Sequence, residues 1–143
     1  MTKLFCVTAC VVALAAFDPA IAAEPAGTWL IQDGTAKVRV YACGEAVCGT
    51  VVWLSQPNDT ETGLPQTDKL NADPQLRARP ILGVQVVLGM QRMGEDNKWI
   101  GRLYNPDDGN IYNGTIELLN AARLKVQGCA GIYCQTEIWT RTN

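Results

Sequence analysis

The sequence predicts an all-β fold: an eight-stranded antiparallel up-and-down barrel with one long loop. Three observations lead to this prediction. Short runs of β-forming residues recur along the chain, nearly all of them are separated by tight turn sequences, and helical periodicity is scarce. Consecutive strands joined by tight turns form an antiparallel meander, and eight strands are enough to close a barrel around side chains or one small ligand.

The strands are expected from apolar and polar residues that alternate along the chain. Val38, Val40 and Ala42, for example, alternate with larger or charged neighbours, which indicates one buried face. Asp107 and Asp108 precede a glycine between two strands, and we assign them to a hairpin turn rather than to a calcium loop. The expected strands cover residues 28–32, 36–43, 48–54, 81–92, 98–105, 110–119, 122–129 and 134–141.

One connection, residues 55–80, is too long to be a simple turn, and such loops in compact domains are usually functional or mobile. Asp73 and Pro74 favour a short helical turn within it. Its polar side chains Asp68, Asn71, Arg77 and Arg79 form a candidate lid at the barrel mouth, since paired arginines suit a carboxylate or phosphate group. The alternative is that these charges pin the loop through salt bridges.

The N-terminus has the three parts of a cleavable bacterial signal peptide. Lys3 precedes an apolar run over residues 4–17, and Ala20-Ile21-Ala22 fits the small-residue cleavage site. We therefore expect residues 1–22 to be removed and residues 23–143 to form a single domain that is periplasmic or secreted. No later run is long and apolar enough for a membrane-spanning helix.

Four cysteines remain after that cleavage, and their number and spacing favour two disulfides. Cys43 and Cys48 are separated by four residues, as are Cys129 and Cys134, and each pair lies between two expected strands. Each pair would close the neck of a four-residue hairpin loop in an oxidising compartment. The alternatives are a zinc site, which generally has closer spacing, and a redox pair, which uses two intervening residues.

The composition argues against several classes of function. The chain has a formal net charge of -2 and no basic cluster, which disfavours nucleic acid as a partner. It contains no histidine, which removes the usual general base and most zinc and copper sites. We therefore expect no metal, no cofactor and no enzymatic activity.

Two motifs at the ends of the expected barrel resemble those of a known fold. Gly27-Thr28-Trp29 and Trp139-Thr140-Arg141 resemble the Gly-x-Trp motif and the terminal-strand arginine of lipocalins. This resemblance implies that Trp29 plugs one end of the barrel and that Arg141 lies across it, where a cation-π contact would stabilise the closure.

The wider chain resembles a family of small exported bacterial proteins of unknown function with a lipocalin-like, calycin-type barrel. The segments that carry this resemblance include Cys43-Gly44, residues 68–80, residues 101–106 and residues 124–129. The resemblance implies a fold and a location and brings no activity with it.

A barrel without catalytic groups favours a binding function. We expect an exported protein that holds a small, mostly apolar or amphiphilic ligand, with the long loop as rim or lid. The alternative is a cell-envelope interaction or structural module with a filled barrel, which docks an envelope protein or another copy of itself. The candidate ligand-lining residues are Trp53, Val84, Val86, Leu88, Trp99 and Leu103.

Overall fold

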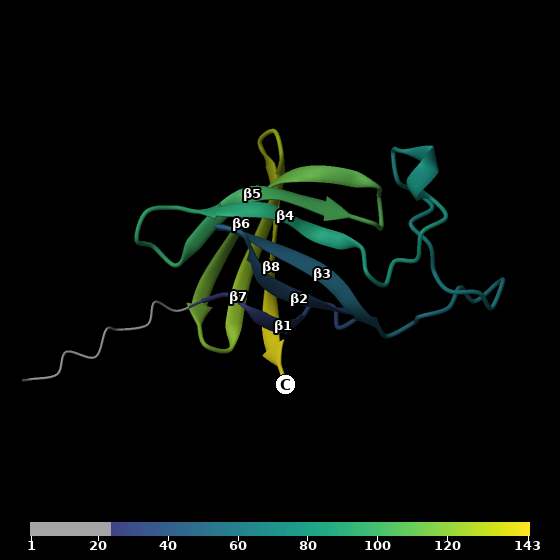
Figure 1. The fold of residues 1–143 in the computed structure, drawn as a ribbon, viewed down its shortest axis with the longest axis horizontal. Helices are drawn as coiled ribbons and strands as arrows, with labels where there is room; N and C mark the ends of the chain where they lie inside the picture. The colour runs from purple at the N-terminus through teal and green to yellow at the C-terminus, as the bar shows by residue number, and fades with distance from the viewer. Residues whose placement is uncertain (1–23) are drawn as a thin grey trace, which may run out of the picture.

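The computed structural model describes residues 24–143, which form a closed barrel of eight antiparallel strands (Figure 1). The fold class predicted from the sequence is confirmed. The proposed signal peptide, with Cys6 and Cys10, lies outside the described residues. The strands are β1 (Gly27–Leu30), β2 (Ala36–Cys43), β3 (Ala46–Leu54), β4 (Gln85–Arg92), β5 (Lys98–Asn105), β6 (Asn110–Asn120), β7 (Arg123–Ala130) and β8 (Tyr133–Thr142).

Each strand pairs with its neighbours in sequence, and β1 pairs with β8 to close the barrel. The connections therefore alternate between the two ends of the barrel. At one end, called here the closed end, lie three short turns, residues 44–45, 93–97 and 121–122. At the other, called here the open end, lie residues 31–35, 55–84, 106–109 and 131–132, of which the long segment projects to the right in Figure 1.

The hairpins that carry the cysteines are tighter than expected. Cys43 pairs with Ala46, and Ala130 pairs with Tyr133, so each loop has two residues. The expectation of four-residue loops is wrong because the strands continue past the cysteines into the turns. Gly44 and Gly131 have φ values of 65° and 59°, and this left-handed conformation is what two-residue hairpin turns require.

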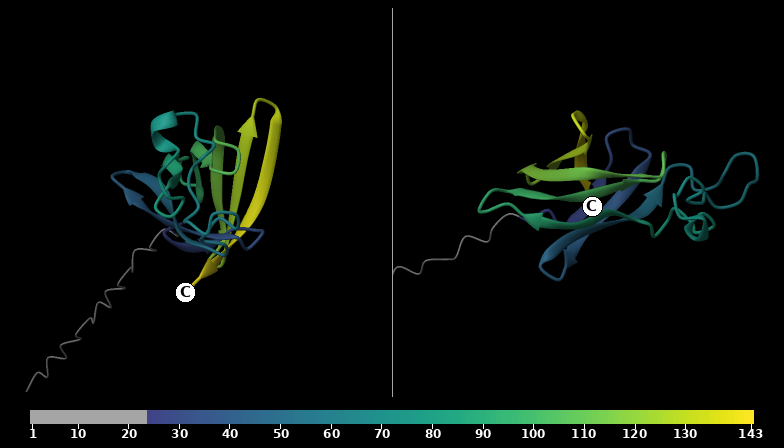
Figure 2. Two further views of the ribbon diagram at one scale, coloured as in Figure 1. Left: turned by 90° about the vertical axis from the view of Figure 1, so that its right-hand side faces the viewer. Right: turned by 90° about the horizontal axis from the view of Figure 1, so that it is seen from above.

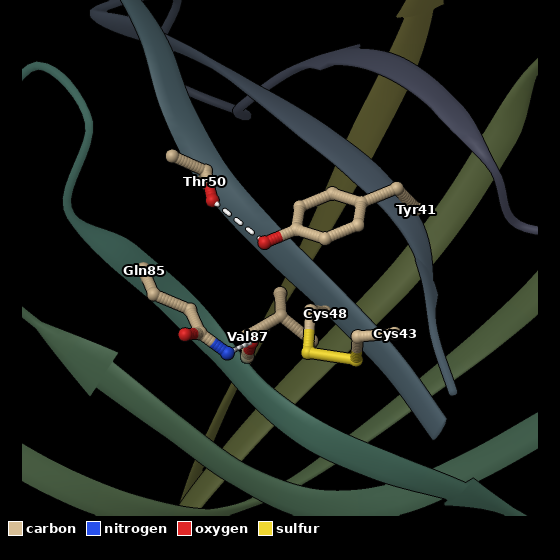
Figure 3. Close-up of a disulfide and its surroundings, with 6 residues drawn as sticks. All are labelled: Tyr41, Cys43, Cys48, Thr50, Gln85 and Val87. Carbon is tan, nitrogen blue, oxygen red and sulfur yellow. Dashed lines mark hydrogen bonds between the residues drawn. A yellow bond between two sulfur atoms is a disulfide. The ribbon is translucent and has the colours of Figure 1, made fainter. Parts of the chain in front are cut away.

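Both hairpins carry a disulfide, as the spacing predicted. Cys129 directly opposes Cys134, with their Cα atoms 4.1 Å apart. Cys43 instead bonds diagonally to Cys48, which lies opposite Tyr41, with a Cα separation of 5.8 Å (Figure 3). The Cys129–Cys134 disulfide therefore holds the β7–β8 hairpin at the open end, and the Cys43–Cys48 disulfide holds the β2–β3 hairpin at the closed end.

The core fills the barrel towards the closed end. Trp29, Met90, Ile116 and Leu124 are fully buried there, with valines of β2, β3 and β4 around them. Alternation on β2 follows the prediction at Val38 and Val40, which are almost fully buried, but not at Ala42, which is exposed beside the hairpin turn. In the described part of the chain, no helix is long and apolar enough to cross a membrane.

Trp29 and Arg141 close the barrel where the first and last strands meet. They are register partners, and the Arg141 guanidinium carbon lies 4.2 Å from the centroid of the Trp29 ring. Arg141 also donates a hydrogen bond to the Ala26 carbonyl at 2.6 Å. Gly27 leaves room for this contact, since a Cβ at that position would lie 2.2 Å from a guanidinium nitrogen. The arrangement is the one that the resemblance to lipocalins implied.

Candidate functional site

A cavity of about 640 Å³ occupies the barrel near its open end, within the size range of small-molecule sites. Its inner wall is apolar and includes Val38, Val51, Val86, Leu103 and Val126. This half of the barrel is hollow, in contrast to the filled barrel on which the alternative function rests. In the left view of Figure 2 the long loop lies over one part of this end and the β7–β8 hairpin stands beside it.

The outer part of the cavity is polar and aromatic. The turn between β5 and β6 contributes Asp107 and Asp108, and β8 contributes Gln135 and, directly opposite Val126 of the apolar wall, Glu137. Tyr112 donates a hydrogen bond from its hydroxyl to the Asp108 carboxylate, which raises the pKa of Tyr112. Apolar depth and a polar rim are what an amphiphilic ligand would require.

Strand β8 lacks a strand neighbour on one of its two sides over more than half of its length. β1 pairs only with residues 140–142 of β8, so the preceding part of β8 has no strand neighbour on that side within the described residues. Gln32 partly replaces a strand there, because its side-chain oxygen accepts a hydrogen bond from the Ile138 amide at 2.8 Å. Gln135 and Glu137 are consequently solvent-exposed although they line the cavity.

The long loop is fastened to the barrel by the carboxylate of Asp68, which is completely buried. Asp68 accepts hydrogen bonds from the Tyr104 hydroxyl, from Asn71 Nδ2 at 2.8 Å and from Arg79 Nε at 2.9 Å. A second Arg79 nitrogen lies 2.8 Å from the same carboxylate. These contacts join one loop to strand β5, so the Asp68 cluster (Asp68, Asn71, Arg79 and Tyr104) fixes the loop in place.

Protonation in the Asp68 cluster is set by burial and by these hydrogen bonds. Burial alone would raise the pKa of Asp68, but the donors Tyr104, Asn71 and Arg79 outweigh it and hold that pKa below its usual 3.8. Burial and the adjacent Asp68 carboxylate raise the pKa of the Tyr104 hydroxyl above 10.0. Asp68 is therefore ionised and Tyr104 neutral near pH 7.

The second half of the loop packs on the outside of the barrel and does not cover the cavity. It contains the short 3₁₀ helix η1 (Pro74–Leu76), with Asp73 accepting a hydrogen bond from the Gln75 amide as its N-cap. The Leu70 carbonyl passes so close to Gly109 that a Cβ there would lie 1.8 Å from the oxygen. The expected helical turn is present, and the pinning alternative describes this part of the loop better than a lid does.

The four candidate lid residues are brought together, but they face one another. Arg79 is engaged by Asp68, and Arg77 Nε donates to the Asn71 carbonyl at 2.7 Å. None of the four lines the cavity. Of the long segment, only Ser55, Gln56, Gln66 and Ile81 reach it.

Two of the six candidate ligand-lining residues, Val86 and Leu103, line the cavity. Trp53 does not: it is 41% exposed and faces outward beside Lys37. The physical reason is a bulge, because Lys37 pairs with Trp53 while Val38 pairs with Val51, which leaves Val52 unpaired and reverses the alternation.

The other three candidates also lie away from the cavity. Register shifts on both sides of β4 break its alternation, so Leu88 faces the hollow between the long loop and the barrel wall. Val84 is buried in the core and does not reach the cavity. Trp99 fills the closed end, where the Arg92 guanidinium carbon lies 5.0 Å from the centroid of its ring.

Sequence reasoning missed the contribution of β8 and of Tyr104. Gln135, Glu137 and Trp139 share the inner face of β8, and Trp139 Nε1 donates to Glu137 at 2.9 Å. Polar residues on an inner face hide the apolar alternation by which buried faces are recognised. Tyr104 lies in the segment 101–106 that carried the family resemblance, but nothing in the sequence pairs it with Asp68.

Two comparisons with known proteins agree with this description. A family model described as "Uncharacterized protein conserved in bacteria (DUF2147)" matches residues 27–141. The structure is similar to that of protein HP1028 from Helicobacter pylori, described as belonging to the lipocalin family, with a TM-score of 0.70 and 21% identity over 84% of each chain. At this identity the likeness shows the fold. No curated protein shows significant similarity to the sequence.

Proposed function

The chain belongs to this bacterial family of uncharacterized proteins, and from that premise we propose that it is an exported binding protein that holds a small amphiphilic ligand in its barrel. The observation that carries the proposal is the cavity of about 640 Å³, apolar inside and polar at its rim. The absence of histidine, which leaves the usual acid–base chemistry without its commonest residue, favours binding over catalysis.

Export is supported by the two disulfides together with the signal-like N-terminus. Disulfides persist in the periplasm and outside the cell, and they are rare in the cytoplasm. Fractionation of cells that express the full chain tests this part. The protein should appear in the periplasmic or secreted fraction with Ala23 as its first residue, and a full-length cytoplasmic protein with four reduced thiols would contradict it.

Ligand binding is tested by native mass spectrometry of protein released from the periplasm without detergent. A defined mass above that of the polypeptide is expected, and denaturation should release it. The matched variant is Gly128→Leu. A Cβ at Gly128 would meet Tyr112 and Leu103 at 3.4 to 3.7 Å, which is ordinary contact, and the rest of the leucine would enter the cavity.

Gln127→Leu is the control for that variant, because Gln127 neighbours Gly128 in β7 but hydrogen-bonds the exposed Thr136 and does not line the cavity. Gly128→Leu should lose the additional mass and Gln127→Leu should keep it. If both variants retain the mass equally, the ligand lies elsewhere and the proposed site is wrong.

A further inference from the structure

The charged side chains that line the cavity all carry the same sign. They are the carboxylates of Asp33, Asp107, Asp108 and Glu137, and no Lys or Arg of the described chain lines the cavity with them. They come from three separate places in the fold: the segment after β1, the turn between β5 and β6, and strand β8. The negative charge therefore comes from several elements around the cavity and not from one acidic segment.

These carboxylates are not compensated from within the protein. Among residues 24–143, the ion pairs involve Glu24, Asp59, Asp68 and Glu117, and none of the four cavity carboxylates. Asp108 and Glu137 accept hydrogen bonds from the neutral donors Tyr112 and Trp139. A neutral donor orients a carboxylate without cancelling its charge, so the oxygens keep acceptor capacity for a bound group.

The arginines nearest the open end are already occupied. Arg79 pairs with the buried carboxylate of Asp68, and Arg77 donates to the Asn71 carbonyl. The expectation that this arginine pair recognises a carboxylate or phosphate therefore has no support in the geometry. An anionic headgroup in the cavity would meet four negative charges and no positive one, and such juxtaposition of like charges opposes binding.

Aromatic rings lie on the same lining as the carboxylates. Trp139 lies beside Glu137, and Tyr112 lies beside Asp108, with Tyr133 at the rim of β8. Aromatic faces attract organic cations, and carboxylates do so by charge. The same lining includes Val38, Val86 and Val126, which suit an apolar body.

We infer that the ligand class of this cavity is a cationic amphiphile, an organic amine or quaternary ammonium compound whose apolar part contacts the valines of the barrel wall while its charge lies among the cavity carboxylates. The inference rests on the proposed binding function and narrows it from any amphiphile to a positively charged one.

The test compares three probes with the same ten-carbon tail and different headgroups: decyltrimethylammonium, decanol and decanoate. Each is titrated into the unliganded mature protein at low salt, below its micelle concentration, with isothermal calorimetry. The ammonium compound should bind at least about tenfold more tightly than decanoate, a difference of about 1.4 kcal/mol. Its affinity should also fall as salt is added, because rim charges are screened.

Glu137→Gln supplies the matched variant, since a glutamine oxygen still accepts the Trp139 hydrogen bond while the charge is lost. Glu95→Gln is its control, because this substitution also removes one negative charge but does so in an exposed turn at the closed end, away from the cavity. Glu137→Gln should weaken binding of the ammonium compound severalfold and leave decanol unchanged, and Glu95→Gln should change neither.

The outcomes separate this inference from the proposed function. If all three probes bind equally well, or decanoate binds best, the barrel is a binding site but its ligand is not cationic. If no probe binds and protein from the periplasm also carries no ligand, the proposed function fails and the inference fails with it.

Discussion

Removing the Tyr104 hydroxyl tests how the long loop is held on the barrel. Tyr104→Phe deletes the hydroxyl that donates to Asp68 and accepts from Asn71 Nδ2, and it leaves the other three contacts of the buried carboxylate in place. A hydrogen bond to a buried charge contributes about 1.5 to 3 kcal/mol, so we expect the free energy of unfolding to fall by about 2 kcal/mol. For a domain of this size, that loss lowers Tm by about 8 °C.

The assay is urea denaturation followed by tryptophan fluorescence, combined with hydrogen exchange of residues 66–80. Exchange in this segment should accelerate in Tyr104→Phe more than exchange in β6 and β7, because the loop loses its anchor first. Tyr112→Phe is the matched control. It removes a tyrosine hydrogen bond to Asp108 at an exposed carboxylate, where water replaces the lost donor, so little change is expected. Equal losses in the two variants would refute the role assigned to the Asp68 cluster.

The remaining predictions concern acid, the open-end disulfide and the closed end. The pKa of Asp68 in the folded protein lies below 3.8, so its contribution to the free energy of unfolding is complete above that pH and is lost as pH falls through the folded pKa. Asp68→Asn should therefore lose less stability than the unmodified protein when urea denaturation is repeated below about pH 4. An equal dependence of stability on pH in the two proteins would contradict this. Replacing both Cys129 and Cys134 by serine should reduce the free energy of unfolding by about 2 kcal/mol. It should also accelerate hydrogen exchange in residues 133–139 of β8, which have no strand neighbour on the β1 side. An unchanged exchange rate there would mean that the disulfide does not stabilise this part of the strand. Gly27→Ala should lower Tm more than Gly34→Ala, since both glycines have positive φ but only at Gly27 would a Cβ collide with Arg141; equal shifts would mean that the Arg141 contact contributes nothing.

The sequence predicted the barrel well because its signals are local. Alternation in β2 and β7, glycine-containing turns and the cysteine spacing each act over a few residues, and all of them agree on an antiparallel meander. The Gly27, Trp29 and Arg141 closure was also accessible, because those residues lie at the two ends of the domain and carry a recognisable motif.

The cavity lining was predicted less well because it depends on irregularities that the sequence does not reveal. One unpaired residue, Val52, turns Trp53 outward, and register shifts in β4 turn Leu88 away from the interior. The Asp68 contact with Tyr104 joins residues 36 positions apart. Such a contact follows from the path of the long loop, and no local pattern specifies that path.

The central claim is that the open half of the barrel is hollow and holds a ligand. A crystal structure of the mature protein, purified from the periplasm without detergent, tests it most directly. We predict non-protein electron density in the cavity lined by Val38, Val86 and Val126, in contact with Glu137. Density that shows the side chains of Tyr112, Tyr133 and Trp139 folded inward, with no space left between them, would contradict it.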